Sequence, residues 1–127
     1  MKILLDTHLL LWAASGELPP KAILHIEDTA NILLFSSASI WEIVIKNGLG
    51  RKDFLVEPTL LYRGLLSAGY QELPVTSRHT LLVSTLAPHH KDPFDRILLA
   101  QSMYERVPLL TADETMLQYN ASVIYVG

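Results

Sequence analysis

Short apolar segments alternate with helix-patterned segments along most of this chain, and this alternation limits its fold more than any other feature. The apolar runs are rich in leucine, isoleucine and valine and too short for helices, which is typical of strands buried on both faces. Strands are predicted at 2–6, 31–36, 70–75, 107–113 and 122–126. This pattern favours a mainly parallel sheet with helices on both faces, so we expect a three-layer α/β/α sandwich.

Helical periodicity and end signals define the intervening segments. Prolines stand at positions suited to a first helical turn, and "NGLG" ends one of the apolar helical runs. Helices are predicted at 7–15, 20–29, 37–50, 58–69, 76–86, 92–105 and 113–118. With 127 residues, half of them hydrophobic, we expect a single domain over 1–127 with its own core.

Composition excludes several classes of protein. The chain has no cysteine, which excludes disulfides, thiolate zinc sites and a cysteine nucleophile, and suits the cytoplasm. The formal net charge is −3, so nucleic-acid binding would need local basic patches or bridging cations. No segment is long enough to cross a bilayer, and we expect a cytoplasmic protein with no membrane partner.

Acidic residues fall where the predicted strands end. Asp6 closes the first strand, Asp113 follows the strand "PLLT", and Glu42 lies early in the helix after "NILLFS". Asp92 and Asp95 open the helix that leads into "PLLT". Because sites in open parallel sheets form outside the carboxyl ends of the strands, we expect these acids at one edge.

Each acid also has a structural interpretation. Ser39 and Glu42 match a capping box, Asp92 and Asp113 could cap the helices that follow them, and Asp95 suits the positive end of a helix dipole. Taken together, however, converging carboxylates would repel one another. Apart from Lys2, at the far end of the first strand, no lysine or arginine lies in "KILLDTH" or "PLLTADE" to neutralise Asp6 or Asp113 from close by. A hard divalent cation such as Mg²⁺ or Mn²⁺ would relieve the repulsion.

Four blocks of sequence, "LLDTHLLLW", "SSASIWEI", "DPFDRILLAQ" and "LLTAD", resemble a PIN domain, specifically the nuclease toxin of a VapC-type toxin–antitoxin pair. The resemblance implies an endoribonuclease dependent on Mg²⁺ or Mn²⁺. Its acidic quartet corresponds to Asp6, Glu42, Asp95 and Asp113. Asp6, Asp95 and Asp113 are expected to hold the metal, and Glu42 to contribute directly or through water.

The same resemblance assigns supporting residues and partners. Thr111 would orient a ligand or water, and Asp92 would cap its helix and support the acids from behind. The family implies a homodimer and an antitoxin that covers the site with a basic side chain. The "DPFDR" block resembles members paired with Phd/YefM-like antitoxins.

Basic and aromatic residues offer further candidates. Lys46, Arg51 and Lys52 form either a phosphate-binding patch for RNA or a solvated turn. Arg96 could reach a substrate phosphate or make an ion pair on the helix surface. We expect His89 and His90 in a solvated loop, and Trp12 and Trp41 in packing contacts at core or interface positions.

Two other functions compete with the ribonuclease. A receiver-type signalling domain also collects acids at a parallel sheet edge, but it should have paired acids near the first strand and a lysine after the last. A non-catalytic PIN-like binding module would keep the fold without the chemistry, although all four acids are present. Cleavage of DNA instead of RNA also stays open.

Overall fold

Five strands of the computed structural model, which describes residues 1–127, form one wholly parallel sheet in the order β3-β2-β1-β4-β5. This finding confirms the predicted sheet and shows that no strand is antiparallel. The strands are β1 (Lys2–Leu5), β2 (Ile32–Ser36), β3 (Gln71–Leu73), β4 (Leu109–Thr111) and β5 (Val123–Tyr125).

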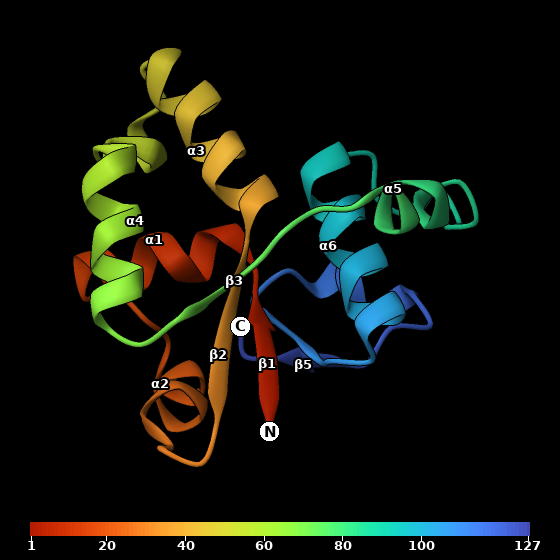
Figure 1. Cartoon of the computed structure of the whole chain (residues 1–127), viewed down its shortest axis with the longest axis horizontal. Coiled ribbons are helices and arrows are strands. Elements are labelled where there is room, and N and C mark those ends of the chain that lie inside the picture. The colour runs from red at the N-terminus through yellow and green to blue at the C-terminus, as the bar shows by residue number, and fades with distance from the viewer.

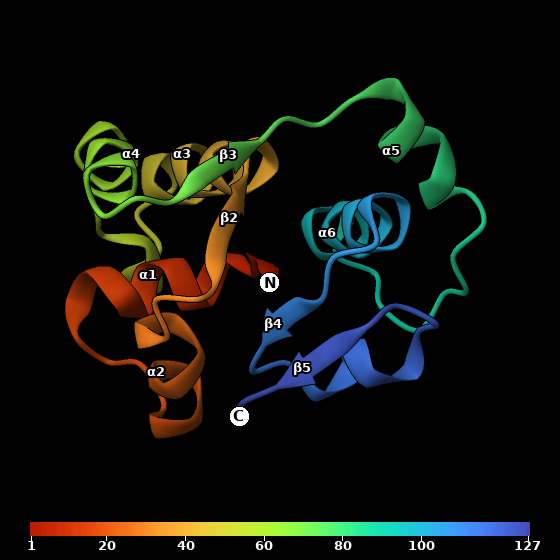
Figure 2. The same cartoon turned by 60° about the horizontal axis from the view of Figure 1, so that its bottom comes forward.

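Helices cover both faces of this sheet, as predicted. Helices α1, α2 and α4 gather on one side, and α5 and α6 lie on the other (Figure 1, Figure 2). None of the helices is long and apolar enough to cross a membrane. The helices are α1 (Thr7–Ser15), α2 (Pro20–Glu27), α3 (Ser37–Gly48), α4 (Pro58–Ser67), α5 (Ser77–Val83) and α6 (Pro93–Glu105), with short 3-10 turns η1 (Lys52–Phe54) and η2 (Glu114–Gln118).

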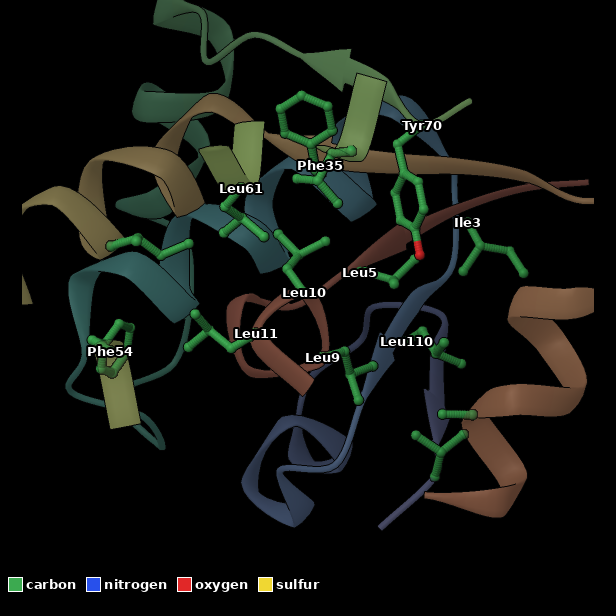
Figure 3. Packing of buried hydrophobic residues seen from close by; sticks show 14 residues of the cluster. Ile3, Leu5, Leu9, Leu10, Leu11, Phe35, Phe54, Leu61, Tyr70 and Leu110 are labelled. Atoms are coloured by element: carbon green, nitrogen blue, oxygen red, sulfur yellow. The ribbon is translucent and has the colours of Figure 1, made fainter. Parts of the chain in front are cut away.

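The core divides into two clusters because successive residues of a strand point to opposite faces. Ile3 and Leu5 enter the larger cluster, which includes Phe35 and residues of α1 and α4 (Figure 3). Leu4 enters the smaller cluster with Leu98 and other residues near α6. Every strand residue of β1 after Lys2 is therefore buried, which explains its unbroken apolar sequence.

The chain adds strands to the sheet on both sides of β1, and the direction of addition changes between β1 and β4. The chain adds β2 and then β3 on one side of β1, and later returns to add β4 and β5 on the other. Register pairs Leu4 with Leu109, and the Asp6 amide donates to the Leu110 carbonyl at 3.0 Å. Such a switch point is where open α/β sheets place their ligand sites, outside the carboxyl ends of the strands.

Three of the acids cap helices at this edge. Asp6 accepts from the Leu9 amide at the start of α1, Asp92 from the Phe94 amide of α6, and Asp113 from the Thr115 amide of η2. The capping box of Ser39 and Glu42 was a wrong interpretation. Helix α3 begins at residue 37, directly after the strand, so Ser36 is its cap and accepts from the Ala38 amide.

Candidate metal centre

Two acids from distant parts of the chain meet where β1 and β4 end, and Thr111 joins them. The buried Thr111 hydroxyl donates to Asp6 Oδ2 and accepts the Asp113 amide hydrogen at 2.9 Å. The other oxygen of Asp6 accepts from the Leu9 amide at 3.0 Å, and only 5% of this residue is exposed. Thr111 therefore fixes Asp6 and the backbone of Asp113 relative to each other.

This arrangement predicts a cost for removing the hydroxyl. Thr111→Val should lower the free energy of unfolding by about 1–3 kcal/mol, because a buried carboxylate oxygen and a backbone amide would be left without their partner. Chemical denaturation in EDTA measures the change. The same substitution at the exposed Thr80 is the matched control, with an expected effect below about 0.5 kcal/mol. Equal stability of T111V and the wild type would contradict this role for Thr111.

Asp95 reaches the same edge from the first turn of α6, where a loop histidine joins it. His90 Nε2 lies 2.8 Å from Asp113 Oδ2 and 3.0 Å from Asp95 Oδ2. One ligand atom from each of these three residues lies within 4.8 Å of the others. The expectation of a solvated loop was wrong for His90, and its place two residues before the helix cap was the only signal in the sequence.

Glu42 enters from α3 and brings a lysine with it. Lys46 Nζ donates to Glu42 Oε2 and lies 3.8 Å from Asp92 Oδ2. The converging acids are therefore not without a basic partner, although this lysine pairs with Glu42 and Asp92 and not with Asp6 or Asp113. Residues four apart share one face of a helix, and this spacing could have identified the Glu42–Lys46 pair from the sequence.

The basic neighbours leave the negative charge incompletely balanced. Burial raises the pKa of Asp6. Burial, with repulsion from Asp92, Glu42 and Asp6, raises the pKa of Asp95 to about 7 even with His90 beside it. For Asp113, burial alone would raise the pKa. Hydrogen bonds from His90 and the Thr115 amide outweigh burial, so the pKa of Asp113 lies below its usual value. The raised values mean that an added cation would be favourable here.

An unpartnered oxygen supports the same conclusion. Glu42 is 2% exposed, and its Oε1 has no hydrogen-bond partner. A buried carboxylate oxygen without a partner is costly. The surrounding donors are mainly carboxylate oxygens, which suit hard divalent cations such as Mg²⁺ and Mn²⁺. The residues present therefore fit a divalent metal ion.

Comparisons with known proteins agree with this architecture. The family model of the PIN domain matches residues 3–121. The chain belongs to the PIN domain family. The receiver-type alternative was therefore wrong. A search of curated protein sequences gave no match.

Solved structures share the fold of this PIN domain. One chain of VapBC2 from Rickettsia felis, bound to a DNA fragment from its promoter, aligns with a TM-score of 0.74 at 14% identity over 100% of both chains. A toxin–antitoxin complex from Klebsiella pneumoniae aligns at 0.67 and 19% identity over 98% of both chains. VapBC-5 from Mycobacterium tuberculosis aligns at 0.64 and 16% identity, over 98% of this chain and 97% of the other.

The remaining basic candidates of this PIN domain lie apart from the acids. Arg51 and Lys52 are exposed at η1, where Arg51 Nε lies 3.8 Å from Asp53 Oδ1. Arg96 forms no ion pair. Its guanidinium donates instead to four carbonyls between the end of α5 and the start of α6, those of Val83, Leu86, Ala87 and His90. The expected surface ion pair of Arg96 was therefore wrong, and its donors serve to close this loop.

Trp41 lies on the surface and not in the core, which leaves the interface position that was its other predicted place. It is 63% exposed and packs edge-to-face on Phe94, with ring centroids 5.4 Å apart. The two rings border a groove of about 450 Å³ between α3 and the start of α6. In the chain, Trp41 directly precedes Glu42 and Phe94 directly precedes Asp95.

Proposed function

We propose that this PIN domain is a metal-dependent endoribonuclease that acts as the toxin of a toxin–antitoxin pair. The observation that carries the proposal is the convergence of acids from four distant segments. Thr111 joins Asp6 to Asp113, His90 joins Asp113 to Asp95, and Glu42 lies close enough to Asp95 to raise its pKa. Family membership and the fold shared with VapBC proteins support it.

Asp6, Asp95 and Asp113 are the residues that would hold Mg²⁺ or Mn²⁺, with Glu42 contributing directly or through water. A divalent cation in such a site lowers the pKa of a bound water, which supplies the nucleophile for phosphodiester hydrolysis. Thr111 holds Asp6 in place, and Asp92 fixes the start of α6 beneath Asp95. We propose products with a 5′-phosphate and a 3′-hydroxyl.

Lys46 is the basic residue best placed to meet a substrate phosphate. Its ammonium lies between Glu42 and Asp92 and 4.9 Å from the centroid of the Phe54 ring. Phe54 belongs to η1, next to the exposed Arg51 and Lys52. These two residues would bind the RNA backbone farther from the acids than Lys46 does. An attracted phosphate backbone would run from these residues towards the acids.

Cleavage of RNA by the purified chain tests the function. Pooled cellular RNA is incubated with Mg²⁺, with Mn²⁺ or with EDTA, and the new ends are sequenced. We expect discrete cleavage with either cation and none in EDTA. Undiminished cleavage in EDTA would remove the metal from the proposal. Bound Mn²⁺ without cleavage of any RNA would favour the non-catalytic module, and cleavage of DNA alone would change the substrate.

Removal of the η1 charges should weaken RNA binding without sequence preference. In the Arg51→Gln, Lys52→Gln double variant, log K should fall less steeply with log salt. The slope should become shallower by about 1 for each phosphate that the protein no longer neutralises. Fluorescence anisotropy with a labelled single-stranded RNA in EDTA measures this slope. A Lys21→Gln, Arg63→Gln variant removes the same charge from α2 and α4 and serves as the control. Equal slopes for both double variants would place the RNA elsewhere.

We also propose two protein partners. Solved structures with this fold include a toxin–antitoxin complex and a member of the VapBC family of toxin–antitoxin systems. They support an antitoxin, Phd/YefM-like by the "DPFDR" block, that covers the acids. Exposed apolar residues on α3, among them Trp41 and Val44, provide surface for it or for a homodimer. Such an enzyme would act in the cytoplasm, where its RNA is. Co-expression of the neighbouring small gene should suppress cleavage, and ultracentrifugation reports the dimer.

A further inference from the structure

His90 is held among the acids by contacts on its backbone as well as its ring. Its amide donates to the Tyr119 hydroxyl at 2.7 Å, and its carbonyl accepts from Arg96 Nη1 at 3.1 Å. The same hydroxyl donates to the Ala87 carbonyl, and the same guanidinium binds three more carbonyls of this loop. The loop is thus fastened at both sides of the histidine, which places the ring in one position.

The ring itself has a defined tautomer. Nδ1 accepts the Asp92 amide hydrogen at 3.1 Å, so the proton of the neutral imidazole lies on Nε2. That N–H donates to Asp113 Oδ2 at 2.8 Å, beside Asp95 Oδ2. To bind a metal, His90 would have to offer the lone pair of Nε2. The ring proton would then lie on Nδ1, where it would face the Asp92 N–H. In this arrangement His90 is a donor and cannot be a ligand.

Asp113 is the acid that most needs such a donor. Its side chain is 36% exposed, against 21% for Asp95, and Glu42 and Asp6 are buried. Besides its bonds to Thr115 at the start of η2, the carboxylate accepts a hydrogen bond from His90, which is the larger side-chain influence on it. Donors behind a carboxylate ligand fix its orientation, and their removal weakens metal binding about 10- to 100-fold.

We propose that His90 is a positioning residue that orients the Asp113 carboxylate for a divalent cation by donating a hydrogen bond to it, without itself binding the cation. This inference rests on the metal binding in the proposed function. It assigns a role to a residue outside the acidic quartet, and it makes the loop before α6 part of the site.

Mn²⁺ alone is the probe for this role, with two readouts that do not depend on cleavage. Electron paramagnetic resonance of free Mn²⁺ gives the affinity of each variant, and pulsed measurements on the bound ion report nitrogen coupling from a ligating imidazole. We expect no such coupling in the wild type. His90→Ala should bind Mn²⁺ about 10- to 100-fold more weakly, and His90→Gln should stay within a few-fold of the wild type because its amide can donate as Nε2 does.

His89→Ala is the matched control, since the neighbouring ring packs on Tyr119 and touches none of the acids, and its affinity should not change. Nitrogen coupling in the wild type would overturn the inference by making His90 a ligand, and this result requires no variant to fold. Unchanged affinity in H90A, or an H90Q variant as weak as H90A, would also overturn it. Each of these results leaves the ribonuclease proposal standing, whereas a wild type that binds no Mn²⁺ removes both.

Discussion

Asp95→Asn should lower RNA cleavage at least about a hundredfold while the fold stays intact. The substitution removes one negative oxygen from a carboxylate that lies 3.0 Å from His90 and close enough to Asp92, Glu42 and Asp6 for their charges to raise its pKa. Asparagine has nearly the same size, and the cap that Asp92 provides to α6 is unchanged because the Asp95 amide, not its side chain, takes part in it. Single-turnover cleavage at saturating Mg²⁺ measures the effect, and circular dichroism reports the fold.

A second aspartate provides the matched control for this experiment. Asp28 ends α2 just before β2 begins, so it lies at the opposite edge of the sheet from the acids. Asp28→Asn makes the same chemical change and should cleave at the wild-type rate. If D95N cleaved as fast as D28N, Asp95 would have no part in the chemistry.

The metal-free protein should become less stable as the pH rises from about 4 to 7. The folded-state pKa of Asp95 is about 7, above its ordinary value of 3.8, so in this window the folded chain binds more protons than the unfolded chain. Stability then falls with pH. The raised pKa of Asp6 acts in the same direction. The lowered pKa of Asp113 makes stability rise with pH, but this effect is confined to pH values around and below the ordinary pKa of aspartate, 3.8.

This dependence should be on the order of 2 kcal/mol, and thermal unfolding in EDTA should give a Tm several degrees higher at pH 5 than at pH 8. D95N should flatten the dependence, and D28N should leave it unchanged. Saturating Mn²⁺ should raise the Tm most at the higher pH, because a ligand that binds only the folded state stabilises it. A Tm that rises with pH in the metal-free wild type would contradict the crowding of carboxylates.

The fold was predictable because the signals for it are local. Apolar runs such as Ile3–Leu5 identify strands buried on both faces, and prolines and glycines identify helix ends close to where the structure has them. The rule that parallel strands share a carboxyl edge then brings Asp6 and Asp113 together, although they are more than a hundred residues apart in sequence. Repeating patterns and topology were sufficient for this much.

The charge balance of the site was not predictable in the same way. The basic partners of the acids do not lie beside Asp6 or Asp113 in the sequence: Lys46 comes from the helix of Glu42, and His90 from a loop. The position of His90 depends on Tyr119, 29 residues away, and on Arg96. For a related reason the sequence left open whether Trp41 packs in the core or at an interface: its apolar neighbours do not reveal which side of α3 is left uncovered.

The pairing of β1 with β4 at the centre of the sheet makes the assembly of the acids a non-local event in folding. Asp6 and Asp113 are joined through Thr111 only where these two strands lie side by side. Closing so long a loop costs chain entropy before the contacts repay it. A partly folded chain in which β4 has not yet paired with β1 therefore holds at most part of the acidic set.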